Sequence, residues 1–159
     1  MFRNNTKLKK IESQYFDLSQ VSVQQSTSSS GNYSTFYGCK ALEEIEDIGL
    51  PAGGYNSTFD NCEKLKTIAV LRVQEDTAAN VRAFYCRELE NITIVGTIGT
   101  STFNFQLCTK LTHDSLMSIV NALEEKTEGT WSVALGATNL AKLTDAEKAM
   151  ATQKGWTLA

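Results

Sequence analysis

Apolar residues return at a fixed distance along the first two thirds of this chain. The phrase F-x-x-C-x-x-L-x-x-I recurs, and its cysteines Cys39, Cys62, Cys86 and Cys108 lie 23, 24 and 22 residues apart. An earlier copy starts at Phe2. Self-similarity at such a period is typical of repeat proteins, in which each unit buries its apolar face against its neighbours. We therefore expect a stack of about five short repeats.

Each repeat is expected to contain one short strand. The residues after the leucine of the phrase alternate, as Ile92 and Ile94 do against Asn91 and Thr93, and alternation of period two indicates a half-buried strand. Stacked repeats would pair these strands in parallel and align their apolar residues as interior rows. The predicted interior rows are Phe36, Cys39, Leu42, Ile45, Phe59, Cys62, Leu65, Ile68, Cys86, Leu89, Ile92, Phe105, Cys108 and Leu111.

The first copy runs from Phe2 to Ile11 and has Asn5 at the cysteine position. A buried asparagine can hydrogen-bond the backbone of a tight corner, so this exchange is compatible with the same fold. Asn5 lies 34 residues before Cys39, which exceeds one repeat by about 11 residues. The polar stretch 24–32 is predicted to be an inserted loop that accounts for the surplus.

After the fourth cysteine the apolar period changes from repeat to helix. Apolar residues at i, i+3, i+4 and i+7, starting at Leu116, predict a helix over roughly 113–126, with Gly129 just past its end. Alternation over 131–135 then predicts a strand. Thr144 begins a capping box that opens a helix over about 145–153.

A last short strand is predicted at 156–158, after Gly155 ends the preceding helix. The chain therefore ends in a helix, a strand, a helix and a strand that do not repeat. An array of repeats needs such an end, because the open apolar face of its last unit must be covered.

The repeated phrases are similar to those of a known family. STFYGCKALEEI (34–45) and STFDNCEKLKTI (57–68) resemble the cysteine-containing leucine-rich repeats called BspA-type or Treponema-type. The stretches 111–129 and 142–158 resemble the C-terminal cap found on such repeats in gut bacterial surface proteins and in phage and prophage structural proteins.

The resemblance implies an α/β repeat fold. It would be a short leucine-rich-repeat solenoid of about five coils of 22–24 residues over 1–111, closed by a helix-strand-helix-strand cap over 112–159. It also implies a non-catalytic adhesion or recognition module, located at a bacterial cell surface, outside the cell or on a virion. The family offers no catalytic residue to carry over, so an enzyme is not expected.

Composition excludes several classes of protein. The 159 residues are 42% hydrophobic and 21% charged with a net charge of −3, which differs from the composition of a disordered chain. The acidic balance makes nucleic acid an unexpected partner. No run of 18 apolar residues occurs, so no membrane insertion is expected. The N-terminus has no secretory signal, and an exported protein would have lost its signal or carry it on a longer parent.

The four cysteines do not have the spacing of a metal site. Zinc ligands usually come in pairs two to four residues apart, and no such pair is present. We expect four buried thiols that act as small apolar residues. Neighbouring repeats would lie about 4.8 Å apart, so distance alone leaves a disulfide possible, although in-register side chains point in the same direction. No metal and no cofactor are expected.

The single histidine, His113, lies beside Asp114 and Ser115 at the start of the predicted helix. Consecutive residues of a helix point about 100° apart, so these three side chains cannot form a catalytic triad. We expect a solvated or capping helix start instead.

The remaining candidates are surfaces for recognition. Repeat proteins of this kind bind through the outward positions of the strand face, where successive units make one strip. Its character should change from charged at the N-terminal side to small and polar at the C-terminal side. The predicted strip consists of Lys10, Glu12, Glu44, Glu46, Thr67, Ala69, Asn91 and Thr93.

Two further surfaces are predicted. The loop tyrosines Tyr33, Tyr55 and Tyr85 are candidate contacts for a glycan or a protein, or else pack over the corners. At the other end, Phe2, Leu8 and Ile11 should present an open apolar edge with unpaired strand groups.

Two functions remain open. The first is recognition of a protein or glycan ligand on a bacterial surface or as part of a phage tail or capsid decoration. The alternative is a structural assembly piece whose N-terminal edge self-associates, docks on another subunit or docks on the rest of a longer parent chain. The solution mass of the purified chain would separate these functions.

Overall fold

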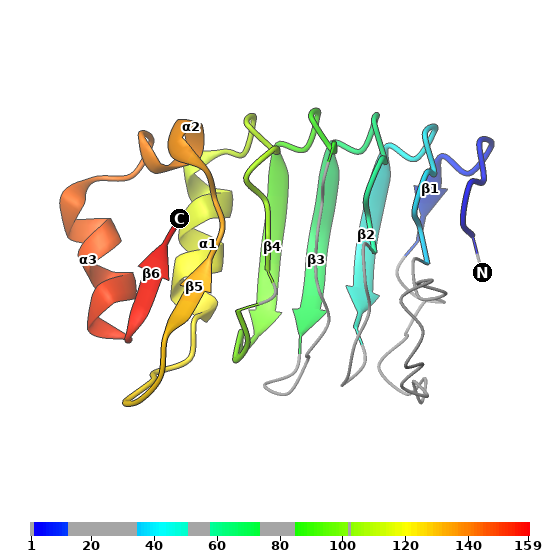
Figure 1. The fold of residues 1–159 in the computed structure, drawn as a ribbon. Helices are drawn as coiled ribbons and strands as arrows, with labels where there is room; N and C mark the ends of the chain where they lie inside the picture. The colour runs from blue at the N-terminus through cyan, green and yellow to red at the C-terminus, as the bar shows by residue number, and fades with distance from the viewer. Residues whose placement is uncertain (1, 13–34, 51–57, 74–84, 102) are drawn as a thin grey trace.

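The computed structural model describes residues 2–12, 35–50, 58–73, 85–101 and 103–159. Within them the chain is a mixed α/β protein built on a four-stranded parallel sheet, whose strands lie side by side in the order in which they occur along the chain (Figure 1). The strands are β1 (Lys10–Ile11), β2 (Glu44–Gly49), β3 (Thr67–Val73) and β4 (Asn91–Gly96).

The register of the sheet places equivalent residues of successive copies next to one another. Ile11 pairs with Ile45, Ile45 with Ile68, and Ile68 with Ile92, and all four isoleucines are buried. A slip of one residue would move these side chains to the solvent face, so burial fixes the register. The register shifts between Ile68 and Leu71, where β3 has one residue more than β4.

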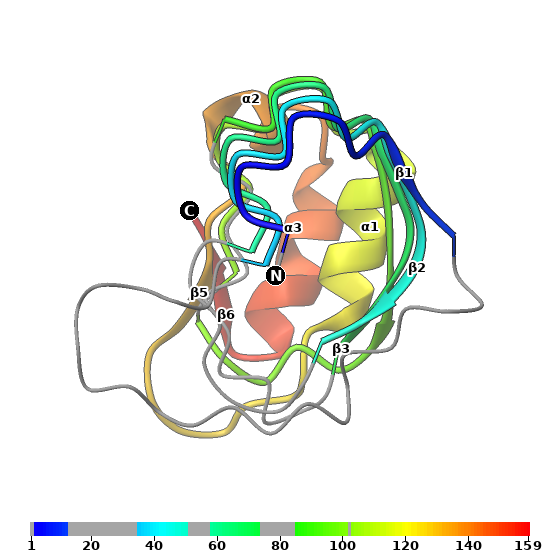
Figure 2. The same ribbon diagram turned by 90° about the vertical axis from the view of Figure 1, so that its right-hand side faces the viewer.

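The corner before each strand has the same hydrogen bonds in successive copies. The amides of Cys39, Cys62 and Cys108 donate to the carbonyl three residues earlier, as Cys62 does to Phe59 at 3.2 Å. The amide of the leucine after each cysteine donates to the cysteine carbonyl, as Leu65 does to Cys62 at 3.0 Å. Viewed along the row, the corners superpose (Figure 2). In four copies the backbone is left-handed at the residue before the cysteine, or before Asn5 in the first copy. These residues are Asn4, Gly38, Asn61 and Tyr85.

Neighbouring corners are joined through ring stacking and backbone hydrogen bonds. The rings of Phe36 and Phe59 are stacked, with centroids 5.9 Å apart and planes 3° from parallel. The Phe36 amide donates to the Thr58 carbonyl at 3.0 Å. The predicted interior rows are confirmed, because every residue assigned to them is at most 2% exposed.

The thiols of Cys39, Cys62 and Cys86 also connect their own copies to the preceding ones. The Cys62 thiol donates to the Phe36 carbonyl at 3.0 Å, and the Cys86 thiol donates to the Phe59 carbonyl at 2.8 Å. Asn5 in the first copy uses its side chain differently: Oδ1 accepts from two amides of its own corner, at 3.0 Å each. The hydrogen-bonding role predicted for Asn5 is confirmed, but the residue is half-buried instead of buried.

Helix α1 (His113–Ala122) lies against the free side of β4 (Figure 1). Two serines of the helix satisfy the backbone of that strand. Ser115 Oγ accepts from the Ile92 amide at 2.9 Å and donates to the Glu90 carbonyl at 3.1 Å, and Ser118 Oγ accepts from the Ile94 amide at 2.8 Å. An edge strand that would otherwise invite pairing is therefore closed by hydroxyl groups of a helix.

Helix α1 is shorter than the sequence predicted. It ends at Ala122 instead of near 126, because the chain turns there to pair with a segment that follows β4. The Ile98 amide donates to the Ala122 carbonyl at 2.7 Å, and the Glu124 amide donates to the Ile98 carbonyl at 3.1 Å. Gly129 belongs to a later turn.

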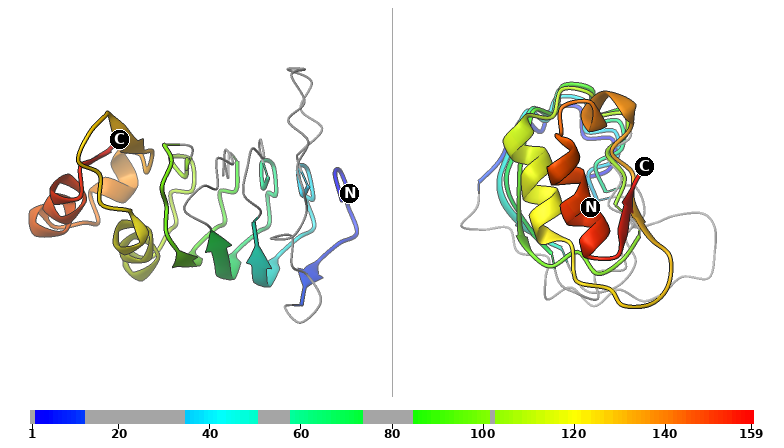
Figure 3. Two further views of the ribbon diagram at one scale, coloured as in Figure 1. Left: turned by 90° about the horizontal axis from the view of Figure 1, so that it is seen from below. Right: turned by 90° about the vertical axis from the view of Figure 1, so that its left-hand side faces the viewer.

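The C-terminal part confirms the strand and helix predicted over 145–158 and adds a short helix. The Thr144 capping box is present, as predicted. The cap helices α1 and α3 lie side by side at the end of the row (Figure 3). Strands β5 and β6 pair in parallel as a separate sheet. The elements are β5 (Trp131–Val133), α2 (Ala137–Leu140), α3 (Asp145–Gln153) and β6 (Trp156–Leu158).

Polar side chains attach these elements to the last corner. The buried Asn139 amide donates to the carbonyls of Cys108 and Leu135, at 3.1 and 2.9 Å. Lys154 Nζ donates to the Asn121 and Leu123 carbonyls, at 2.7 and 2.9 Å, and so caps the C-terminus of α1. A cation is favourable at this end of a helix because its last carbonyls have no helical partner.

Replacing Ser115 by alanine should lower the stability of the fold. Ser115 is 3% exposed and its hydroxyl accepts from Ile92 N–H, so its removal leaves that buried amide unsatisfied, while Glu90 C=O keeps the Thr112 amide as a partner at 2.9 Å. We expect the free energy of unfolding to fall by about 1–3 kcal/mol, measured by urea denaturation. Thr130→Ala, at an exposed position, is the control. Equal midpoints for Ser115→Ala and the parent would contradict the edge-closing role.

Candidate functional site

The structure brings the predicted strand-face residues together on the solvent side of the sheet. Lys10 pairs with Glu44, Glu44 with Thr67, and Thr67 with Asn91, so these four side chains form one row across the sheet. The other four predicted members each lie two residues further along the chain, and all eight residues are exposed or half-buried. These members are Glu12, Glu46, Ala69 and Thr93. We call the eight residues the strand-face strip.

The one cation of the strip is paired with two of its three carboxylates. Lys10 Nζ lies 2.5 Å from Glu46 Oε1 and 3.7 Å from Glu44 Oε1. The hydrogen bond to Glu46 is the main reason that the pKa of Lys10 is raised. Nearby, the Arg72 guanidinium makes a two-pronged contact with the Asp47 carboxylate, with its shortest distance at 2.7 Å. These charges are therefore already satisfied before any ligand arrives.

The other half of the strip is uncharged and small. Thr67, Ala69, Asn91 and Thr93 carry hydroxyl, methyl and amide groups only. The structure adds Val95, which is 40% exposed and was not predicted. Its exposure follows from the alternation in β4, where Ile92 and Ile94 point inward, so the same pattern could have identified it.

A column of alternating charge borders the strip, and the sequence analysis missed it. The residues directly before the first row are Lys9, Glu43, Lys66 and Glu90, and each amide after the first donates to the carbonyl of the one before, at 2.8 to 2.9 Å. Comparing this position between copies in the sequence would have shown the alternation. Opposite charges on adjacent strands stabilise the pairing, and like charges would oppose it.

The N-terminal edge is less apolar than predicted. Ile11 is only 7% exposed, and Phe2 and Leu8 are half-buried against the core. The Phe2 ring stacks on Phe36 with 5.7 Å between centroids. What the edge exposes is positive charge: Lys7 and Lys9 are exposed, and neither forms an ion pair with any residue in the described ranges.

Of the predicted loop tyrosines, only Tyr85 is in the part of the chain that the structure describes. Tyr33, Tyr55 and the predicted loop 24–32 lie outside it. Tyr85 is 47% exposed, with the Arg87 guanidinium carbon 5.7 Å from its ring centroid. Its backbone φ of 63° is left-handed. Tyr85 forms one wall of a surface depression described below.

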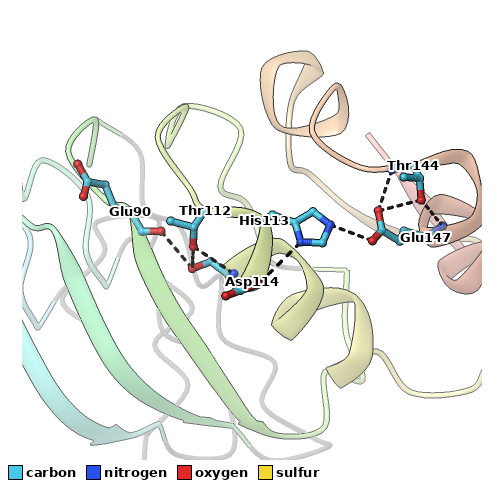
Figure 4. Close-up of polar contacts among 7 residues, drawn as sticks. Glu90, Thr112, His113, Asp114, Thr144 and Glu147 are labelled. Atoms are coloured by element: carbon cyan, nitrogen blue, oxygen red, sulfur yellow. Dashed lines mark hydrogen bonds and ion pairs between the residues drawn. The ribbon is translucent and has the colours of Figure 1, made fainter.

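His113 and Ser115 do not form a catalytic pair. His113 Nε2 lies 2.8 Å from Glu147 Oε1, and Nδ1 lies 3.8 Å from Asp114 Oδ1 (Figure 4). Ser115 is committed to the backbone of β4 and to Thr112 Oγ1. The pKa of Glu147 is lowered, first by the Thr144 amide and then by the Thr144 hydroxyl. The arrangement ties α1 to α3.

The four cysteines are buried thiols without metal-site geometry. No group of three histidine, cysteine, aspartate or glutamate side chains within the described ranges could hold a metal ion. The cysteines are completely buried. Burial raises the pKa of Cys39 and raises that of Cys108 to about 12. Such thiols are poor nucleophiles, because the thiolate is the reactive form.

Comparisons with protein-family models, with curated proteins and with solved structures find no match to this chain. Among the helices that the structure describes, none has both the length and the apolar character needed to cross a membrane. Functional conclusions therefore rest on the geometry of the surfaces described above.

The buried thiols should make the fold sensitive to alkaline pH. An ordinary thiol has a pKa of 9.0 and Cys108 one of about 12, so between these values the unfolded chain ionises this thiol while the folded chain keeps it protonated. The free energy of unfolding should therefore fall as pH rises through this window, by up to about 1.4 kcal/mol per pH unit for this thiol. Urea denaturation at several pH values measures the slope.

Cys108→Ala removes this one ionisation and should make the slope shallower. Lysine and tyrosine ionisation contributes equally to parent and variant, so the difference between the two slopes isolates the thiol. Identical slopes would show that Cys108 does not ionise on unfolding in this range.

Proposed function

We propose that the chain is a short leucine-rich-repeat solenoid of the BspA type, with five coils and a C-terminal cap. Three features support this assignment: the repeated cysteine phrase, the hydrogen bonds shared by successive corners, and the in-register parallel strands. Each copy makes its contacts with the copies on either side, as repeat architectures require.

The function that the geometry supports best is non-catalytic recognition of a protein or glycan through the strand-face strip. We place it on a bacterial cell surface or on a phage virion. One observation carries the proposal: the sheet register aligns an exposed row in which Lys10 is paired with Glu44 and Glu46 at one end and whose other half is small and uncharged.

The uncharged half is the better contact surface for energetic reasons. Binding removes water from polar groups, and interface centres are depleted of charged residues. Thr67, Asn91 and Thr93 offer hydroxyl and amide groups with little side-chain freedom to lose. Ala69 and Val95 both add apolar area to the same surface. A ligand can therefore bind here without breaking the Lys10 ion pairs.

Bulky charges placed on the uncharged half should abolish binding. Ala69→Arg together with Thr93→Arg fills the strip from exposed positions, so folding should be preserved. We expect binding of the labelled chain to a glycan array and to intact bacterial cells to fall at least tenfold, a loss of about 1.4 kcal/mol. Thr130→Arg, in the C-terminal part, is the matched control. The proposal fails where the double variant binds like the parent, or where the parent binds neither target.

A second candidate function is assembly, and the charge of the N-terminal edge favours it. Residues 2–12 carry four basic side chains and one acidic side chain. The column of alternating charge ends at Lys9, so a strand added beside β1 would be expected to carry a carboxylate at the matching position. The predicted occupant is an acidic strand, of another protein or of the rest of a longer parent chain, that adds to β1. Two copies of this edge would repel each other.

Light scattering of mixed charge variants tests the edge. The parent chain, 17.5 kDa, should remain a monomer at low salt over a concentration series. A Lys7→Glu/Lys9→Glu variant provides an acidic edge, so an equimolar mixture with the parent should form a dimer that dissociates when salt screens the charges. A mixture with Lys148→Glu, altered on α3, should stay monomeric. A parent dimer at low salt, or a mixture that stays monomeric throughout, would refute the acidic-partner hypothesis.

A further inference from the structure

The corner of the fourth repeat has an unusual residue at a conformationally demanding position. The backbone there is left-handed in four copies, with φ values of 59°, 70°, 61° and 63°. Asn4, Gly38 and Asn61 suit this conformation, because glycine and asparagine adopt it most readily. Tyr85 does not, since a bulky side chain is disfavoured there. The fourth corner therefore carries strain that an asparagine would relieve.

Burial does not account for the choice of tyrosine. Tyr85 is 47% exposed, the largest exposed apolar side chain in the described part of the chain. Backbone strain opposes stability, and the contact of the ring with the Arg87 guanidinium, 5.7 Å from its centroid, leaves nearly half of the side chain exposed. Strain of this kind is retained mainly where function requires the side chain.

The ring borders a hollow of suitable size for a small ligand. A surface depression of about 340 Å³ lies between the third and fourth corners. Ligand sites usually measure roughly 300–1,000 Å³, so this one would fit one or two sugar rings. Its walls are Asn61, Glu63, Tyr85, Arg87 and Glu88.

The charges around the depression favour a neutral ligand. Lys40 Nζ lies 2.8 Å from Glu63 Oε1, and Lys110 Nζ lies 2.6 Å from Glu88 Oε2, so each carboxylate has a cation beside it. Two carboxylates in the wall would repel an anionic group, and Arg87 would repel a cationic one. Amide and guanidinium donors alternate with carboxylate acceptors, which matches a ligand with many hydroxyl groups.

We propose that this depression binds a neutral saccharide, with the apolar face of one sugar ring packed on Tyr85. Its hydroxyl groups donate to Glu63 and Glu88 and accept from Asn61 and Arg87. Tyrosine suits such a contact because its ring is rigid and amphipathic. The proposal rests on the recognition function above, but it places the sugar at the corner and does not depend on the strand-face strip.

Tyr85→Asn tests the proposal because it should separate stability from binding. Asparagine fits the left-handed backbone, so the urea midpoint should stay equal or rise. Affinity for the strongest neutral oligosaccharide found on a glycan array should fall at least tenfold by calorimetry. Tyr85→Phe keeps the ring and removes only the phenol hydroxyl. It should bind within about threefold of the parent, because at most one exposed hydrogen bond from that hydroxyl to the ligand is lost.

Several outcomes would overturn this inference. They are undiminished binding by Tyr85→Asn, loss of stability together with binding, an array on which only acidic glycans bind, and an array on which no glycan binds. The Ala69→Arg/Thr93→Arg variant separates the two proposals: saccharide binding should survive in it. If instead that variant loses binding and Tyr85→Asn retains it, the strand-face function stands and the corner site fails.

Discussion

The contact on which the rest of this structure depends is the one between a cysteine and the preceding repeat. The Cys62 thiol meets the Phe36 carbonyl and the Cys86 thiol meets the Phe59 carbonyl, both in a completely buried environment. A thiol is small and apolar enough to be buried there, yet it supplies a weak donor to a carbonyl inside the corner. This contact sets the distance and orientation between repeats. The stacked phenylalanine rings and the strand register are consistent with the same spacing.

The three candidate surfaces are consequences of that spacing. Once equivalent residues of successive repeats lie side by side, every outward position of the phrase becomes a column. One column gives the strand-face strip, and another gives the alternating charges that end at Lys9. The corner position before the cysteine gives the neighbours Asn61 and Tyr85. Recognition and assembly would therefore use different columns of one scaffold, and a change in one need not disturb the other.

The sequence predicted those parts of the structure that depend on periodicity. The interior rows, the parallel strands and the Thr144 capping box all follow from spacing within the chain. It did not predict helix α2, which is too short to show a period, or the end of α1, which is set by pairing with Ile98. The bond between Ser115 and β4 joins segments distant in sequence, so spacing could not indicate it. The strain at Tyr85 depends on a backbone angle that composition does not encode.

The closure of β4 by serine hydroxyl groups also determines how this architecture can change in length. Helix α1 hydrogen-bonds the backbone of the last strand through Ser115 and Ser118, and these bonds make no demand on the number of strands before it. An additional unit of 22–24 residues inserted between β2 and β3 would extend the sheet by about 4.8 Å and leave the terminal helix in place. The length of the molecule can therefore change by whole repeats, through duplication or deletion of the segment that encodes one, and the same C-terminal elements would follow the last strand in each case.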